Sequence, residues 1–379
     1  MLAPVKTGVH VPDRYNGDLL DGYGLNMDFL ILNLEGNPLT ESIDGLTIEL
    51  AEYGTKVYEH RANLTYDGEK FGTIVFKPRS SVIPKNLVQL QLENHLYYTT
   101  DGNELKEMVK TVVEMLGLTY QGVNRIDVAL DYMREQVEMQ QLFQGIFEGK
   151  FLIKGRQKDV NYYTTTQKGK TILNGVQIGK RGTSRFCRIY NKSVEMQKGD
   201  LKPYIADYWK NLGLNGTVWR FEYQLSNKFM RELENVSLDT LFSKNFLFNL
   251  FQKARENHFE LKHNTGKSEV NKEKDYNIID FAKVKKFLGM IGGVIGKLKR
   301  TIKETFIGQQ RMIKGLLRSY FSSGHDIRFL LPVRGILDTF DLWEWYNMKV
   351  PQYIQEFRER EKIKIIDLKQ YELDFKLYA

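Results

Sequence analysis

The chain has few of the residues that form disulfide frameworks or imidazole metal sites. Cys187 is its one cysteine, so no disulfide can form within the chain and nothing argues for secretion. Its six histidines include no His-x-His or His-x-x-x-His pair, which argues against a metal ion held by imidazoles. These absences favour a cytoplasmic protein.

Long apolar runs and nucleotide-binding loops are absent too. No run approaches the roughly 20 apolar residues that a membrane span needs. The first residues lack the charged and then apolar segments of a secretion signal. No Gly-x-x-x-x-Gly-Lys-Ser/Thr loop is present, and we interpret the glycine-rich stretch 289–296 as close packing of helices. We therefore expect no membrane partner.

Positive charge is in excess over an otherwise ordinary composition. Across 379 residues, 42% are hydrophobic and 27% are charged, which is typical of a globular protein. The formal net charge of +8 favours an anionic partner, with nucleic acid ahead of a membrane surface. Between residues 281 and 320, ten lysines and arginines accompany a single acid, Glu304. This pattern is typical of a basic amphipathic helix that is solvated or lies on DNA.

Hydrophobic periodicity predicts an α+β fold: a mostly antiparallel sheet with helices on one face, plus a helical C-terminal region. Apolar or alternating runs predict strands at 27–33, 56–66, 71–77, 87–98, 124–132, 159–166, 171–179, 184–192 and 217–226. Apolar residues at helical spacing predict helices at 103–116, 135–147, 203–211, 229–257, 278–321 and 338–362. Asp67-Gly68 predicts a hairpin turn between two of the strands.

Changes in composition divide the chain into three parts. Residues 1–24 are rich in Gly, Asp and Pro and are interpreted as an N-terminal arm. Residues 25–259 contain all the predicted strands and form the main domain. A polar, charged stretch at 260–275 is interpreted as a linker or exposed loop. Residues 260–379 are therefore expected to form a helical, basic C-terminal domain, with the boundary near residue 260.

The predicted strand 125–131 carries two carboxylates on one face. Alternate residues of a strand share a face, so Arg125, Asp127, Ala129 and Asp131 point one way. Four residues of strand span about 13 Å, so a flat strand cannot place both aspartates on one metal ion. Which aspartate would bind a metal stays open, and a solvated face with an Arg–Asp pair is the simpler alternative.

The predicted strand 219–225 has the same form. Arg220, Glu222 and Gln224 share one face, and the aromatic and aliphatic residues share the other. Glu222 is a natural second ligand for a hard divalent cation, which prefers oxygen donors. The alternative is a surface glutamate that pairs with Arg220.

The predicted strand 184–192 adds a phenol to these acids. Tyr190 and Arg188 share a face, while Cys187 and Ile189 face the core. A phenol has a pKa near 10 and is a poor nucleophile at neutral pH without help. We expect Arg188 and Lys192 to lower the pKa of Tyr190. Together, the three strands suit metal-assisted attack of a tyrosine on a phosphodiester.

Taken in order, three segments resemble the replication initiation factor family. They are Arg-Ile-Asp-Val-Ala-Leu-Asp (125–131), Arg-Phe-Cys-Arg-Ile-Tyr-Asn-Lys-Ser-Val-Glu (185–195) and Trp-Arg-Phe-Glu-Tyr-Gln-Leu (219–225). The resemblance covers roughly residues 25–227. The family includes initiators of rolling-circle plasmids, relaxases of some conjugative elements and filamentous-phage initiators.

The resemblance implies a chemistry and a set of residues. A tyrosine would nick DNA at an origin hairpin, single-stranded at the cleavage point, leaving a 5′-phosphotyrosyl link and a free 3′-hydroxyl that primes synthesis. The matching residues are Tyr190 as nucleophile, assisted by Arg188, and Asp127, Asp131 and Glu222 as ligands of Mg²⁺ or Mn²⁺. We also expect DNA contacts from Arg185, Lys192 and Arg220.

The implied function is site-specific nicking and rejoining of DNA, by residues 25–259, to start rolling-circle replication of a plasmid or related element. A homodimer and a host helicase are the further partners that the resemblance implies. A conjugative relaxase or a phage initiator would use the same chemistry. A non-catalytic basic DNA-binding protein is the alternative of another class, in which the acids are only structural pairs.

Overall fold

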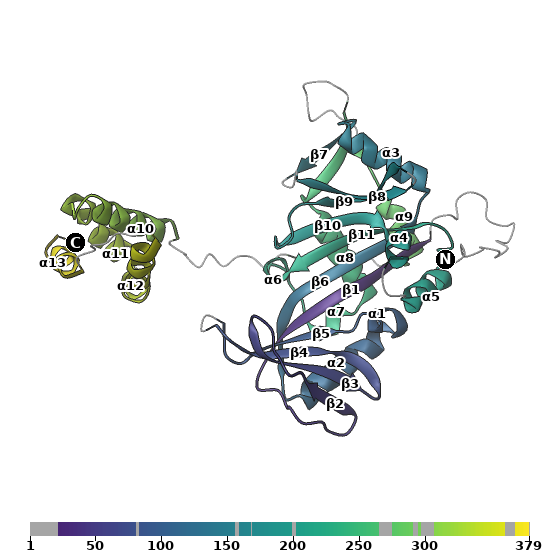
Figure 1. The fold of residues 1–379 in the computed structure, drawn as a ribbon, viewed down its shortest axis with the longest axis horizontal. Coiled ribbons are helices and arrows are strands. Elements are labelled where there is room, and N and C mark those ends of the chain that lie inside the picture. Colours follow the sequence, from purple (N-terminus) through teal and green to yellow (C-terminus); the bar gives the residue numbers. More distant parts are fainter. Residues whose placement is uncertain are drawn as a thin grey trace. The chain divides into compact units, whose positions relative to one another are not determined.

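The structure is a computed structural model that forms two compact units, Met1–Leu298 and Lys299–Ala379 (Figure 1). It describes residues 22–80, 83–155, 159–167, 169–198, 202–264, 275–290, 295–296, 307–360 and 368–378. The predicted arm at 1–24 lies almost wholly outside these residues. The sequence placed the domain boundary near residue 260, whereas the contacts place it between residues 298 and 299.

The first unit is built on a ten-stranded antiparallel sheet, which confirms the predicted α+β class (Figure 1). Its strands, in spatial order, are β2 (Leu46–Leu50), β3 (Tyr58–Tyr66), β4 (Glu69–Pro78), β5 (Leu87–Leu92), β1 (Tyr23–Glu35), β6 (Thr119–Met133), β11 (Val218–Ser226), β10 (Arg185–Asn191), β9 (Lys170–Ile178) and β8 (Val160–Gln167). The Asp67-Gly68 hairpin joins β3 to β4, and both residues have positive φ angles, 48° and 82°. The short strand β2 was not predicted.

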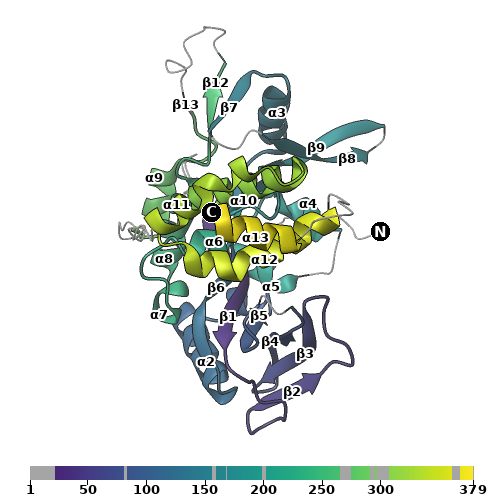
Figure 2. The same cartoon turned by 90° about the vertical axis from the view of Figure 1, so that its left-hand side faces the viewer.

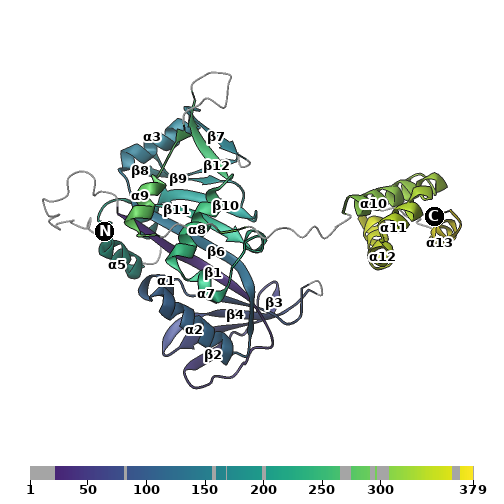
Figure 3. The ribbon, with the colours of Figure 1, turned by 180° about the vertical axis from the view of Figure 1, so that it is seen from behind.

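Helices flank this sheet and connect its strands. Their bounds are α1 (Leu96–Thr99), α2 (Gly102–Met115), α3 (Gln136–Phe147), α4 (Lys192–Met196), α5 (Pro203–Asn211), α6 (Asn227–Met230), α7 (Leu238–Leu241), α8 (Lys244–Arg255) and α9 (Phe281–Phe287). Seen from behind, α8 and α9 lie against one face of the central strands (Figure 3). The helices on that face bury the apolar side of the strands and leave their other side to the polar residues of β6, β10 and β11.

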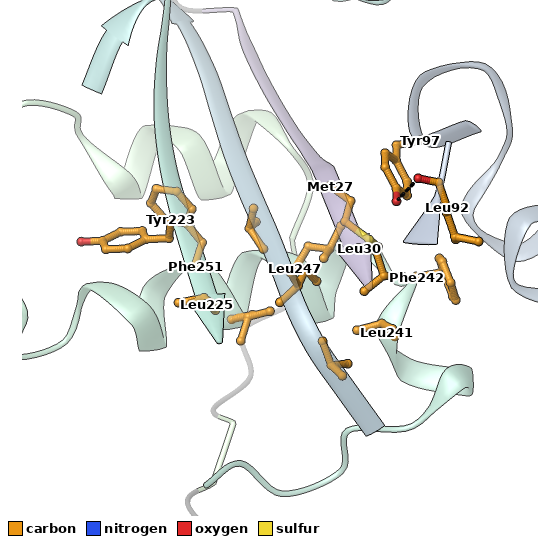
Figure 4. Packing of buried hydrophobic residues seen from close by; sticks show 14 of the residues in the cluster. Met27, Leu30, Leu92, Tyr97, Tyr223, Leu225, Leu241, Phe242, Leu247 and Phe251 are labelled. Carbon is orange, nitrogen blue, oxygen red and sulfur yellow. Dashed lines mark hydrogen bonds between the residues drawn. The ribbon is translucent and has the colours of Figure 1, made fainter. Parts of the chain in front are cut away.

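The core between α8 and the sheet explains why the strand faces alternate as the sequence predicts. Phe251 of α8 packs edge-on against Phe221 and Tyr223 of β11, with ring centroids 5.2 Å apart in each pair. Leu247 and Leu225 lie beside them (Figure 4). Because these side chains pack on α8, a one-residue slip of β11 would turn them to the opposite face, among the charged groups, so the register of β11 is fixed.

A second, three-stranded sheet pairs β7 (Phe151–Gly155), β12 (Phe259–His263) and β13 (Asp275–Tyr276) (Figure 2). These strands were not predicted, and the polar stretch that begins at 260 was interpreted as a linker or loop. β12 pairs with β7, more than 100 residues earlier in the chain. Pairing with such a distant segment satisfies the backbone hydrogen bonds of this short polar strand. The local sequence pattern does not reveal such a partner.

His258, just before β12, is expected to make stability depend on pH. Burial lowers the pKa of His258 to about 4, and its ring packs between Tyr223 and Phe259. An unfolded chain takes up a proton near pH 6.5 that the folded chain does not, so stability falls as the pH drops from about 6.5 to 4. The loss should reach about 3 kcal/mol. Urea unfolding across this range should show a shallower loss for His258→Phe, and an equal loss would contradict the assignment.

The second unit is helical, as the sequence predicts for the C-terminal region. It comprises α10 (Ile307–Ser322), α11 (Leu331–Thr339), α12 (Trp343–Arg360) and α13 (Leu368–Tyr378), with a short 3₁₀ turn at Ile327–Phe329. Its core includes Leu317, Tyr320 and Phe357, and the Tyr320 hydroxyl donates to Asp374 at 2.6 Å.

The long helix predicted at 278–321 is represented by α9 and α10. Lys297, Lys299, Arg300 and Lys303 of the basic stretch lie outside the described residues. Within the described part of the chain, no helix has the length and apolar character needed to cross a membrane.

Candidate active site

Strands β6, β11 and β10 lie side by side and bring the three charged segments onto one face (Figure 1). In the register, Arg188 pairs with Glu222, which pairs with Ala129. The next row places Tyr190 opposite Arg220 and Arg220 opposite Asp131. Residues directly opposite one another in an antiparallel pair point to the same side. The face is therefore opposite to the one that packs on α8.

Tyr190 is half-buried on this face, and its hydroxyl donates to Glu222 Oε2 at 3.0 Å. Arg188 donates to the other oxygen of the same carboxylate. Burial and the charge of Glu222 raise the pKa of Tyr190 well above its usual value, although Arg220 and Arg188 act in the opposite direction. Arg188 acts in the expected direction, but desolvation and the adjacent carboxylate outweigh the cations, so the net pKa rises instead of falling. Tyr190 therefore depends on a base to become a nucleophile.

Asp127 is the second carboxylate of the site. Its side chain is 2% exposed and accepts two hydrogen bonds from Arg125, at 2.8 and 2.6 Å. Arg188 Nη2 lies 3.9 Å from Asp127 Oδ2 and also contacts Glu222, so one guanidinium joins the two acids. Burial raises the pKa of Asp127 to about 6, and the nearby charge of Glu222 adds to the effect while Arg125 opposes it. A further cation at this acid pair would be favourable.

Asp131 belongs to a separate, buried network. Arg220 donates to both of its oxygens, at 2.6 and 2.7 Å, and Trp209 of α5 donates to one of them at 2.7 Å. Arg220 also donates to Asp28 at 2.6 Å and to the Tyr98 hydroxyl at 3.0 Å. Asp127, and not Asp131, therefore faces the same guanidinium as Glu222.

Asp28 was missed by sequence reasoning. It lies where the pairing of β1 with β6 is interrupted between Met27 and Phe29, which turns its side chain toward Arg220. Burial acts to raise the pKa of Asp28, but the attraction of Arg220 and Lys192 outweighs it and holds that pKa below its usual range. No sequence pattern reveals a bulge of this kind, because it depends on the partner strand.

The three cations predicted to contact DNA are each engaged by other groups of the protein. Arg220 is fully buried in its ion pairs. Lys192 is 2% exposed and lies 2.7 Å from Glu195. Arg185 points to the opposite face, where it donates to the carbonyl groups of Ala254 and Glu256 at the end of α8. Each of these cations therefore contributes to the fold, and its contact with DNA stays a prediction.

Two further residues that the sequence did not single out lie beside Tyr190. Gly175 of β9 pairs with Tyr190, and a Cβ atom at Gly175 would come within 2.6 Å of the Tyr190 Cβ. The next strand places Tyr163 opposite Gly175, with its ring centroid 6.4 Å from that of Tyr190. Because glycine has no side chain, Gly175 leaves the space that Tyr190 occupies. Only the pairing of β8, β9 and β10 shows that these residues are neighbours.

The donor set fits a hard divalent cation in kind, because Asp127 and Glu222 offer oxygen atoms only. Mg²⁺ is often held by one or two carboxylates and completed by water and phosphate oxygens. Across the described residues, no group of three or more His, Cys, Asp or Glu side chains is arranged to hold a metal ion. The residues thus fit a two-carboxylate site that Asp131 does not complete.

Comparisons with known proteins found one family and similar solved structures. The replication initiation factor family matches residues 121–322, which include Asp127, Tyr190 and Glu222. Among solved structures, a rolling circle replication initiator protein from Geobacillus stearothermophilus is similar, with 12% sequence identity and a TM-score of 0.45. That match covers 70% of this chain and 98% of the other. No curated protein matches. Since the family match spans more than half of its length, the chain belongs to the replication initiation factor family.

Proposed function

We propose that this protein starts rolling-circle replication of a plasmid or related mobile element by nicking and rejoining one DNA strand with Tyr190. Membership of the family assigns it to the initiation of DNA replication. The observation that carries the proposed chemistry is the hydrogen bond from the half-buried Tyr190 hydroxyl to Glu222, beside Arg188. A phenol, a base and a cation on one face are what a phosphoryl transfer to tyrosine needs.

In the first step, Glu222 takes the proton of the Tyr190 hydroxyl as the phenolic oxygen attacks the phosphorus. The bond from phosphorus to the Tyr190 oxygen forms, and the bond to the 3′-oxygen breaks. The 3′-oxygen leaves, takes a proton from solvent water and ends as a free hydroxyl, and the 5′-phosphate remains on Tyr190. Attack by a 3′-hydroxyl on the phosphotyrosine reverses these events and rejoins the strand.

Arg188 is placed to stabilise the charge that develops on the phosphate. Its Nε–H is buried and has no hydrogen-bond partner among the described residues. An unpaired buried donor is costly unless a ligand satisfies it, and a phosphate oxygen is a suitable acceptor. Asp127 and Glu222 would hold a Mg²⁺ or Mn²⁺ ion, which would supply Lewis-acid polarisation of the scissile phosphate.

Covalent capture tests the proposed function against a non-catalytic DNA-binding protein. Purified protein is incubated with a supercoiled plasmid that carries the cognate origin, and the products are separated in SDS. We expect nicked plasmid and an SDS-resistant DNA–protein adduct. Specific binding without an adduct would favour the binding protein. The same adduct is expected of a conjugative relaxase or a phage initiator. The family resemblance alone suggests two further partners, a helicase and a second copy of the chain.

Removal of divalent metal is expected to stop cleavage. EDTA should reduce nicking by at least about 100-fold, and Mn²⁺ or Mg²⁺ should restore it. Asp127→Asn should raise the metal concentration needed for half-maximal nicking, because one of two carboxylates is lost. Asp239→Asn is the control, since Asp239 is an exposed partner of Lys110 on the surface. Full nicking by metal-stripped protein in EDTA would contradict the proposed metal site.

A further inference from the structure

The face that carries Tyr190 is covered at one end of the strands. Trp209 of α5 donates to Asp131 at 2.7 Å, and the Tyr98 hydroxyl of α1 accepts from Arg220 at 3.0 Å. Asp131 and Arg220 are buried beneath these contacts. A DNA strand bound at Tyr190 is therefore blocked on this side, and along the strands it can continue only toward the start of β10.

Toward the start of β10, a further row of side chains lies on the same face, beyond Arg188. Phe186 of β10 pairs with Gln224 of β11, which pairs with Asp127 of β6. These three residues form the Phe186 row, which lies four residues from Tyr190 along β10, or about 13 Å. Successive nucleotides of a strand are at least about 3.4 Å apart, so this row lies within about four nucleotides of a phosphate bound at Tyr190.

Arg181, in the turn before β10, adds a cation to the Phe186 row. Its Cζ atom lies 5.9 Å from the centre of the Phe186 ring, and its side chain is exposed. It forms no ion pair or hydrogen bond with another residue in the described part of the chain, whereas the preceding Lys180 lies 3.7 Å from Asp159. An unpaired guanidinium is a natural partner for a phosphate group.

Gln224 offers an uncharged contact in the middle of the row. It is partly exposed, and its amide has no hydrogen-bond partner among the described residues. The neighbouring carboxylate of Asp127 is held by Arg125, at 2.8 and 2.6 Å. The amide of Gln224 can therefore donate to one group of a nucleotide and accept from another.

We propose that the Phe186 row, together with Arg181, binds the DNA strand next to the scissile phosphate: Arg181 contacts a phosphate, and Gln224 hydrogen-bonds a nucleotide. The proposal rests on the proposed nicking function, since Tyr190 fixes where the strand lies. Two observations favour a DNA strand as the occupant. The row continues the face of the nucleophile, and the charge that Arg181 adds is positive and unpaired among the described residues. The bases of a single strand also expose edges that an amide can contact.

Salt-dependent binding tests the two contacts. The parent protein is Tyr190→Phe in EDTA, and fluorescence anisotropy follows its binding to a fluorescein-labelled 20-mer of thymidine from about 50 to 200 mM salt. Arg181→Gln in this parent should weaken binding about fivefold at the lowest salt. It should also lower the slope of log affinity against log salt by about 0.7, because one phosphate contact with a single strand is lost. Gln224→Leu should weaken binding about fivefold without changing the slope, since it removes no charge.

Two matched controls make the same changes elsewhere. Arg79→Gln alters an exposed arginine just after β4, which donates to the Thr55 carbonyl group. Gln252→Leu alters a partly exposed amide on α8, behind the sheet. Both should keep the parent affinity and slope. Parent-like affinity and slope in Arg181→Gln would overturn the proposal, as would an equal loss in the controls. If Arg181→Gln does not melt cooperatively, Gln224→Leu decides by the same comparison.

The nicking proposal and the DNA-path proposal fail in different ways, because the binding assay contains no nucleophile and no metal. Absence of the covalent adduct from the wild-type protein, with the expected loss of binding in Arg181→Gln, would overturn the nicking chemistry and support strand binding by the Phe186 row. A normal adduct, with parent-like binding by both Arg181→Gln and Gln224→Leu, would overturn the DNA path and leave the nicking chemistry in place.

Discussion

Tyr190→Phe should abolish nicking and the covalent DNA adduct while leaving DNA binding largely intact. The substitution removes one oxygen atom, which is the proposed nucleophile, and keeps the ring that packs near Tyr163. A step that loses its nucleophile has no substitute among nearby groups, so the rate should fall by at least about 10⁴-fold, as for other unit-acting catalytic groups. Gel analysis of nicked plasmid and SDS-resistant adduct provides the measurement.

A matched control uses the neighbouring phenol. Tyr163→Phe removes a hydroxyl from the same face, where it bonds Gln177. This variant should still form the adduct, because Tyr163 does not contact Glu222 in the structure. If Tyr163→Phe loses the adduct and Tyr190→Phe keeps it, the nucleophile has been assigned to the wrong tyrosine.

The second large effect concerns stability. Arg220→Met is expected to lower the free energy of unfolding by about 3–5 kcal/mol, because it leaves Asp131 and Asp28 buried without their counterion. Arg220 is fully buried and its pKa is raised well above the usual value: burial lowers it, but attraction to Asp131 and Asp28 prevails. Urea unfolding followed by tryptophan fluorescence should report the loss.

Arg134→Met provides the matched comparison for this prediction. Arg134 lies 3.7 Å from Glu138 in a largely exposed pair, so its loss should cost no more than about 1 kcal/mol. Wild-type stability in Arg220→Met, together with weaker DNA binding, would restore the DNA-contacting role that the sequence suggested. Unchanged DNA binding by those Arg220→Met molecules that stay folded would agree with a structural role.

The alternation of side chains between the two faces of a strand explains how much of the site could be predicted. Tyr190, Arg188, Glu222 and Asp127 share a face because alternate residues of a strand point the same way, and the apolar residues between them must face the core. This inference needs only the order of residues along each strand, and the structure agrees with it. The inference did not predict the contacts of Arg185. This residue lies at the start of β10 and donates a hydrogen bond to a carbonyl group at the end of α8.

Pairing between strands accounts for what could not be predicted. Asp131 and Asp127 lie on the same face of β6, yet Asp131 binds Arg220 and Asp127 faces Arg188. The choice depends on the register of β6 with β11 and on Trp209 of α5. The rise in the pKa of Tyr190 likewise comes from burial by neighbouring strands, which a count of nearby cations in the sequence does not include.

The sequence by itself determined the α+β class, the faces of the three charged strands and the family, because these depend on local periodicity and on short motifs. Only the tertiary structure decided which aspartate faces the same guanidinium as Glu222 and where the predicted DNA-binding cations lie. These properties arise from contacts between segments far apart in the chain, such as Asp28 with Arg220 and Asn191 with Gln136. The burial that shifts the pKa of each group exists only once those segments pack together.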